Sequence, residues 1–168
     1  MSQLRRFQPE VILQRLLAHN VRFVIVGGLA SQVHGSPSLT RDIDICYALE
    51  LDNLQNLAAV LDDLVAVRRG LPLDAPPMRR LDARTLRAGG RLTLSTTAGD
   101  LDLLAVPDPG LDYERLRSAA IQATVAGHAV YVASLEDLMT MKRAAGRPKD
   151  LIELEILGAL REELDREV

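Results

Sequence analysis

The sequence contains no tryptophan, and aromatic residues of all kinds make up only 3% of it. Hydrophobic residues nevertheless account for 48% of the 168 positions, so the core must be built from leucine, valine, isoleucine and alanine. A chain of this length suits one hydrophobic core. We therefore expect residues 1–168 to form a single domain.

Cysteine and long apolar runs are also scarce. Cys46 is the only cysteine, which excludes an intrachain disulfide and favours a reducing, cytoplasmic compartment. No window approaches the roughly 20 apolar residues of a membrane span. The first residues, MSQLRRFQPE, contain no apolar run that could act as a signal. The sequence therefore predicts a cytoplasmic protein without a membrane partner.

An excess of positive charge is missing as well, because the formal net charge is −3. This balance argues against indiscriminate adhesion to nucleic acid, although a local basic surface is compatible with it. Seven arginines lie between Arg68 and Arg91, a segment broken by prolines and glycines. We expect an exposed, partly mobile connection there. It could bind RNA, but without interleaved aromatic residues a solvated loop is favoured.

The periodicity of apolar residues predicts alternating helices and strands. Helices are expected over Pro9–His19, Leu29–His34, Leu51–Val65 and Tyr113–Ala119, and from Ser134 to the end with a break at Gly146-Arg147-Pro148. Strands are expected over Phe23–Val26, Asp42–Tyr47, Arg91–Ser95 and Leu101–Val106, with a second hairpin in Ala123–Val132. This order predicts an α/β fold, with a mixed sheet flanked by helices and a C-terminal helical pair.

Two aspartates alternate with isoleucines in the strand that begins at Asp42. Because successive side chains of a strand point to opposite faces, Ile43 and Ile45 enter the core while Asp42 and Asp44 share the other face. Two neighbouring carboxylates repel each other unless a cation lies between them, and oxygen ligands of this kind suit Mg²⁺ or Mn²⁺. The alternative is an edge strand with one solvated face.

Upstream of this strand, Gly27 and Gly28 end an apolar strand and lead into a helix. Free backbone N–H groups without side chains can receive a phosphate there. The alternative is a tight turn that requires glycine. Downstream, Asp102 lies between two leucines and repeats the alternation, whereas Asp100 is expected in the turn of the hairpin. Asp102 is therefore the candidate for a third acid, and a polar residue on an exposed hairpin face is its alternative.

A glycine pair, then D-I-D on a strand and a later strand with one acid, resembles the nucleotidyltransferase superfamily related to DNA polymerase β. The resemblance implies that Asp42, Asp44 and Asp102 bind Mg²⁺ or Mn²⁺, with Asp102 also a candidate general base. It implies that Gly27 and Gly28 meet the phosphates of a nucleoside triphosphate such as ATP. Many members carry Gly-Ser, so Gly28 lacks a hydroxyl that could touch a phosphate.

The C-terminal helices supply a second pattern. Lys142 lies in an apolar stripe, where an ammonium needs an anion unless it reaches solvent from the rim. Lys142, Arg147 and Asp150 are close enough to form one polar cluster. The spacing K-x4-R-x2-D resembles small AbiEii-type nucleotidyltransferases, many of them toxins of toxin–antitoxin systems. The resemblance implies that Lys142 and Arg147 serve the nucleotide, that Asp150 completes the site and that Glu153 lies outside it.

Three functions are compatible with these patterns. The first is a metal-dependent nucleotidyltransferase that moves NMP from an NTP to an RNA end such as tRNA, or to a partner protein, in a toxin–antitoxin pair. The second is a nucleotidyltransferase acting on a small molecule such as an aminoglycoside. The third is a non-catalytic, antitoxin-like binding module with the same fold. His34 is expected to cap or pack, and Arg41 to contact phosphate or pair with an acid.

Overall fold

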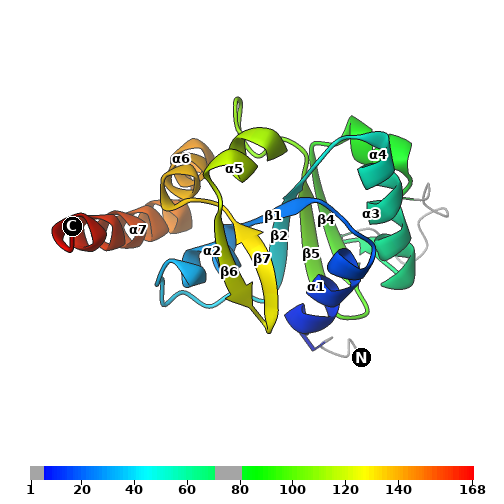
Figure 1. The fold of residues 1–168 in the computed structure, drawn as a ribbon, viewed down its shortest axis with the longest axis horizontal. Helices are drawn as coiled ribbons and strands as arrows, with labels where there is room; N and C mark the ends of the chain where they lie inside the picture. Colours follow the sequence, from blue (N-terminus) through cyan, green and yellow to red (C-terminus); the bar gives the residue numbers. More distant parts are fainter. Residues whose placement is uncertain (1–5, 71–80) are drawn as a thin grey trace.

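The computed structural model describes residues 6–70 and 81–168. Within these residues the strands form one seven-stranded mixed sheet in the order β3-β4-β5-β2-β1-β7-β6 (Figure 1). The strands are β1 (Phe23–Val26), β2 (Asp42–Tyr47), β3 (Val67–Arg68), β4 (Arg91–Thr96), β5 (Gly99–Leu104), β6 (Ile121–Val125) and β7 (His128–Val132). The predicted mixed sheet flanked by helices is therefore confirmed.

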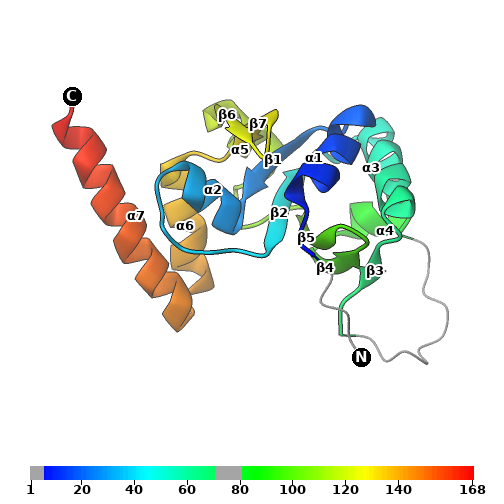
Figure 2. The same cartoon turned by 90° about the horizontal axis from the view of Figure 1, so that it is seen from below.

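The helices are α1 (Pro9–Ala18), α2 (Gly27–Val33), α3 (Leu51–Asp63), α4 (Ala83–Ala88), α5 (Tyr113–Ala119), α6 (Leu135–Ala145) and α7 (Pro148–Arg166). α2 packs against β1 and β2, and α6 packs against α7. α3 and α4 lie at the end of the molecule opposite α6 and α7, and α7 projects from the body (Figures 1 and 2). Across the described residues no helix is both long and apolar enough to cross a membrane.

The predicted C-terminal helical pair is confirmed, and its boundaries follow from local chemistry. The Ser134 hydroxyl accepts the backbone N–H of Asp137 at 3.1 Å and so caps α6. Gly146 ends that helix in the left-handed region at φ +62°. Pro148 then opens α7 at a position where its missing N–H costs nothing.

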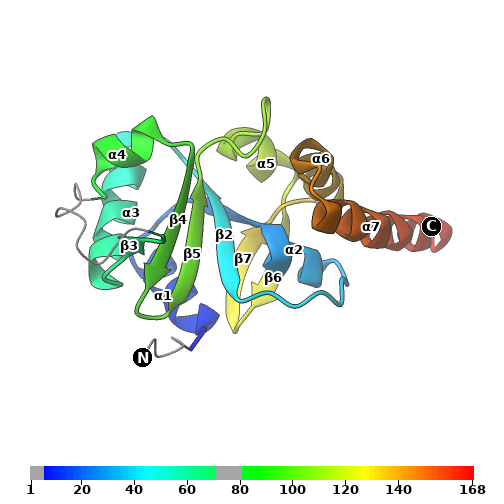
Figure 3. The same cartoon turned by 180° about the vertical axis from the view of Figure 1, so that it is seen from behind.

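The centre of the sheet is made of β5, β2 and β1, and Figure 3 shows β5 beside β2. β2 runs antiparallel to β1 and parallel to β5, with Asp42 opposite Asp100 and Asp44 opposite Asp102. In β2 the isoleucines at 43 and 45 are buried, and the two aspartates that alternate with them are half-buried on the other face. The alternation predicted for this strand is therefore correct.

Two boundaries next to the candidate acids and glycines differ from the sequence prediction. β5 begins at Gly99, so Asp100 lies in the strand and not in the turn. The reason is that the Thr96 hydroxyl donates to the Gly99 carbonyl at 2.7 Å and accepts the Ala98 N–H at 3.1 Å, which closes the turn early. α2 begins directly at Gly27 rather than at Leu29.

The segment Arg68–Arg91 is more ordered than predicted where it is described. β3 pairs with β4, and the Arg69 N–H donates to the Thr93 carbonyl at 2.9 Å. α4 is capped by Asp82, and its Leu86 is fully buried. A strand and a helix therefore form where an irregular connection was expected, because β3 pairs with β4 and Leu86 of α4 is buried. Residues 71–80 of that prediction lie outside the described residues.

Candidate functional site

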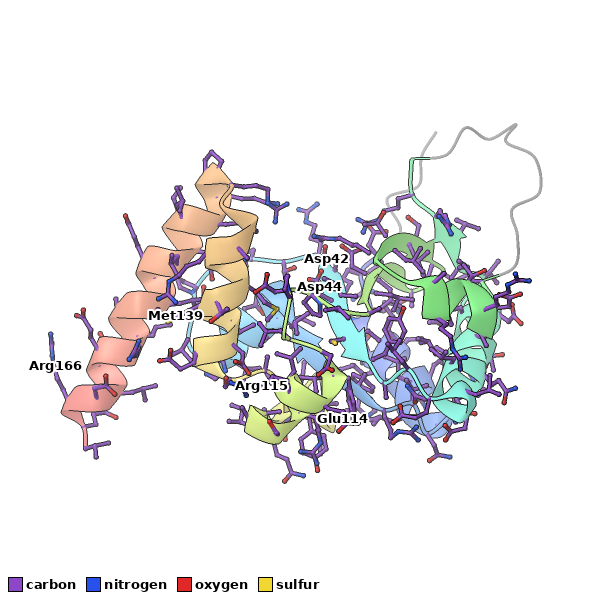
Figure 4. The ribbon with its side chains drawn as sticks, turned by 90° about the horizontal axis from the view of Figure 1, so that it is seen from above. Asp42, Asp44, Glu114, Arg115, Met139 and Arg166 are labelled. Carbon is purple, nitrogen blue, oxygen red and sulfur yellow. The ribbon has the colours of Figure 1, made fainter. Side chains whose placement is uncertain are left out.

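A cavity of about 500 Å³ opens between the start of α2, strand β2 and the C-terminal helix pair. Its lining includes seven of the eight residues singled out from the sequence, namely Gly27, Gly28, Asp42, Asp44, Lys142, Arg147 and Asp150. Figure 4 shows Asp42 and Asp44 at the centre of the molecule, between the C-terminal helices and the β4–β5 side of the sheet. The structure thus brings together residues more than a hundred positions apart in sequence.

The eighth residue, Asp102, lies beside the cavity. The parallel register of β2 and β5 sets it next to Asp44. One carboxylate oxygen from each of Asp42, Asp44 and Asp102 lies within 4.8 Å of the others. An octahedral Mg²⁺ with ligands at 2.0–2.1 Å spans oxygens roughly 3–4 Å apart, so the separation of these three oxygens is close to what one ion requires. The three carboxylates fit a divalent cation in both chemistry and separation.

Burial makes Asp44 sensitive to neighbouring charge. Removal from solvent, and then the like charge of Asp42, raise the pKa of Asp44 to about 6, although Arg91 and Lys142 partly oppose this. A carboxylate that is costly to ionise is stabilised by a cation. The electrostatics of Asp44 therefore favour the binding of a positive ion above pH 6.

The glycine pair is required by close packing against these acids. A Cβ on Gly27, whose φ is +68°, would lie 2.2 Å from Oδ2 of Asp44. A Cβ on Gly28 would lie 2.8 Å from Cβ of Thr40. The Thr40 hydroxyl in turn donates to Oδ1 of Asp42 at 2.7 Å. Gly27 thus lets the backbone approach Asp44 closely, and Gly28 does the same at Thr40. Both glycines also leave this part of the cavity wall without side chains.

Two arginines that the sequence analysis did not assign to the site contact its acids. Arg91 donates to Oδ2 of Asp102 at 3.0 Å and lies 3.8 Å from Oδ1 of Asp44. Arg69 donates to Oδ1 of Asp102 and, at 3.2 Å, to Asp100. Both arginines belong to the arginine-rich segment Arg68–Arg91, although Arg91 was also predicted to begin a strand. The pairing of β3 with β4 could have suggested their position, but β3 is only two residues long.

The polar cluster on the C-terminal helices is confirmed as a set of contacts. The fully buried Asp150 accepts from Nε of Arg147 at 2.6 Å and from Nζ of Lys142 at 3.4 Å. It also accepts the backbone N–H of Arg147 at 3.2 Å. Burial alone would raise the pKa of Asp150, but the bonds from Arg147 and the charge of Lys142 outweigh it and lower that pKa.

Glu153 lines the same cavity, although the sequence analysis left it outside the site. It is 9% exposed, and its two oxygens accept the hydroxyls of Ser36 and Ser38 at 2.7 Å each. These bonds tie α7 to the loop between α2 and β2. His34 makes a structural contact, as expected, because its Nε2 lies 2.8 Å from the Ala133 carbonyl oxygen.

Comparison with known proteins gives fold relatives only. No family model and no curated protein matches the chain. Among solved structures, the lincosamide antibiotic adenylyltransferase LnuA, with lincomycin bound, has a TM-score of 0.59 at 14% identity, covering 93% of this chain and 99% of that one. A candidate nucleotidyltransferase from Thermotoga maritima has a TM-score of 0.55 at 17% identity, covering 99% of both chains.

A third relative is ANT(2'')-Ia, an antibiotic-resistance factor solved in complex with adenylyl-2''-tobramycin. That complex has a TM-score of 0.54 at 18% identity, covering 93% of this chain and 94% of that one. Such low identities establish the fold and not the substrates. The chain has the nucleotidyltransferase fold.

Proposed function

We propose that this chain is a metal-dependent nucleotidyltransferase, which moves NMP from an NTP to an acceptor hydroxyl and releases pyrophosphate. The observation that carries the proposal is the approach of Asp42, Asp44 and Asp102 to within 4.8 Å at one side of a cavity. Lys142 and Arg147 lie on the wall contributed by the C-terminal helices. Carboxylates that can bind a metal ion and positive side chains that can bind phosphates thus surround one cavity, which is large enough for a nucleotide.

The residues have separate roles in this mechanism. Asp42 and Asp44 would hold Mg²⁺ or Mn²⁺, which supplies charge stabilisation at the α-phosphate. Lys142 and Arg147 bind the triphosphate, while Asp150 keeps both cations in place. The acceptor oxygen forms a bond to the α-phosphorus as the bond to pyrophosphate breaks. Asp102 receives the acceptor proton, and Gly27 and Gly28 leave room for the phosphates.

The acceptor is proposed from the two kinds of resemblance. The motif of the C-terminal helices favours an RNA end such as tRNA, or a partner protein in a toxin–antitoxin pair. The names of LnuA and ANT(2'')-Ia favour a small molecule as the second candidate. Transfer assays with labelled NTP on total tRNA, on cell extract and on a panel of antibiotics would separate the two. Copurification of a small partner protein would support the toxin–antitoxin role.

The first test is calorimetric titration of each NTP, with Mg²⁺, into the wild type and into a variant with Asp42→Ala and Asp44→Ala. Binding that requires Mg²⁺ and is lost in the variant would support the proposal and select the nucleotide for the transfer assays. The absence of binding to the wild type at millimolar nucleotide would contradict it. That result would favour a non-catalytic module that retains the fold.

A further inference from the structure

Arg91 occupies a particular position among the three candidate metal ligands. It is the first residue of β4, and its side chain lines the same cavity as Asp44 and Lys142. One of its terminal nitrogens, Nη2, lies 3.0 Å from Asp102 and 3.8 Å from Asp44. The guanidinium therefore stands between these two carboxylates. In a site with two ions, a second ion bridging Asp44 and Asp102 would have to occupy this space.

Asp102 differs from the other two acids in how fully it is engaged. Its side chain is only 3% exposed, and each of its oxygens accepts from a different arginine, Oδ1 from Arg69 and Oδ2 from Arg91. Arg69 is itself held by a second acid, Asp100, which the Ser95 hydroxyl bonds at 2.9 Å. The guanidinium groups of Arg69 and Arg91 are thus held in place by carboxylates, and Ser95 in turn holds one of these carboxylates.

The carboxylates of Asp42 and Asp44 have fewer hydrogen-bond and ion-pair partners than that of Asp102. Asp42 accepts the Thr40 hydroxyl through Oδ1, and among the described residues no donor contacts its Oδ2. The nearest cation to Asp44 is the guanidinium of Arg91, 3.8 Å from its Oδ1. These two carboxylates keep oxygens free for an ion, whereas both oxygens of Asp102 already have positive partners.

We infer that the site binds a single divalent ion through Asp42 and Asp44, and that the guanidinium of Arg91 replaces a second ion between Asp44 and Asp102. The inference rests on the proposed function and reduces the candidate metal ligands from three aspartates to two. Asp102 anchors Arg91 and is not a metal ligand. An arginine keeps its charge at every working pH, and its planar donors suit carboxylates and phosphates, so it can serve as a fixed cation beside the reacting phosphate.

Electrostatic repulsion prevents Asp102 from binding its arginines and a metal ion at the same time. A divalent cation placed on Asp102 would face two guanidinium groups at close range, and both would have to withdraw. Arg69 is held from Asp100 as well, so its withdrawal would break a second ion pair. A single ion on Asp42 and Asp44 requires no such rearrangement.

The experiment counts bound Mn²⁺ on the full chain, without turnover. The protein is saturated with an α,β-methylene nucleoside triphosphate, and bound Mn²⁺ is measured by electron paramagnetic resonance after equilibrium dialysis. We expect one Mn²⁺ per chain. Asp102→Asn should keep that ion with its affinity changed by less than roughly threefold, while Asp44→Asn should weaken it by about tenfold or more.

A second pair of variants tests the position of Arg91 directly. Arg91→Gln should admit a second Mn²⁺ between Asp44 and Asp102. The matched control is Arg68→Gln, since Arg68 is exposed and has no ion pair within residues 6–70 and 81–168. Far-ultraviolet circular dichroism and the melting temperature would verify that each variant is folded, and Arg91→Met, which also removes the charge, would replace Arg91→Gln if that variant is not.

Each outcome has a distinct meaning. Two Mn²⁺ ions in the wild type, or loss of the first ion in Asp102→Asn, would overturn the inference and leave the proposed function standing. A second ion in Arg91→Gln alone would support it, and a count that stays at one there would overturn the assignment of Arg91. Failure of the wild type to bind any Mn²⁺ with the nucleotide would overturn both the inference and the proposed function.

Discussion

At the scale of single residues, Asp44 lies in the candidate metal site, and the ionisation of its buried carboxyl group lowers the stability of the fold. Its pKa is raised to about 6 by burial and by Asp42, whereas an aspartate in an unfolded chain titrates near 3.9. Between these pH values the folded protein binds the extra proton. Its stability therefore falls as the pH rises from about 4 to 6, and the loss is complete above pH 6.

Asp44→Asn is predicted to stabilise the protein in the absence of metal. The amide cannot ionise, so above pH 6 the variant should exceed the wild type by about 1–3 kcal/mol in the free energy of unfolding. Near pH 4 the two should be alike. Chemical denaturation in the presence of a chelator measures this difference. Added Mg²⁺ should raise the melting temperature of the wild type only, and equal stabilisation of the variant would contradict the assigned ligand.

Gly27 is the second residue with a sharp prediction. Alanine at this position would place Cβ 2.2 Å from Oδ2 of Asp44 and would adopt φ +68°, which is strained for any residue with a Cβ. We expect Gly27→Ala to lose about 2–4 kcal/mol of stability and to displace Asp44. Urea denaturation and Mn²⁺ affinity should both show the loss.

Gly158 provides the matched control for that change. It lies inside α7, and the nearest atom to a Cβ there is Cε of Met139 at 4.0 Å. Gly158→Ala should therefore stabilise the protein by about 0.5–1 kcal/mol through helix propensity and leave Mn²⁺ affinity unchanged. Equal losses in both glycine variants would show that the effect at Gly27 is not due to contact with Asp44.

At the scale of elements, the bonds from Glu153 to Ser36 and Ser38 fasten the α2–β2 loop to α7. Glu153→Gln keeps the size of the side chain but replaces one acceptor oxygen by a donor, so one serine hydroxyl loses its charged partner. We expect amide hydrogen exchange to become faster by about tenfold in residues 36–41, while exchange in β4 and β5 stays unchanged. Unchanged protection of the loop would contradict this fastening role.

The alternation in β2 and the caps of α6 were predictable because they depend on neighbours in sequence. Ile43 and Ile45 needed burial, which fixed the face of Asp42 and Asp44. The contacts of Arg69 and Arg91 with Asp102 were not predictable, because the two arginines reach it only through the pairing of β3, β4 and β5. A two-residue strand gives no periodic signal, so Arg69 looked like part of a solvated loop.

The start of β5 shows the same limit at shorter range. Asp100 was expected at the end of a turn over residues 96–100, yet two hydrogen bonds of Thr96 close the turn before Gly99. A side chain that bonds its own turn shifts a strand boundary by two residues. Such a shift matters here because it places Asp100 on the face of Asp102, where it holds Arg69.

At the scale of the whole molecule, the described residues share one core. Buried residues of α1, of the central strands and of α7 belong to one hydrophobic cluster, which includes Leu13, Ile45 and Leu157. One sheet also runs from β3 to β6 without interruption of its pairing. Elements from both ends of the sequence therefore depend on the same buried contacts.

This arrangement predicts that the chain unfolds as one cooperative unit. In differential scanning calorimetry we expect a single transition, in which the calorimetric enthalpy equals the van't Hoff enthalpy. α6 and α7 should melt with the sheet, because Leu138 and Leu157 are buried in the shared core. A separate early transition, removed by deleting residues 147–168, would show that the C-terminal helices unfold independently. In that case Lys142 and Asp150 would be able to leave the three aspartates without global unfolding, and nucleotide binding should suppress that early transition.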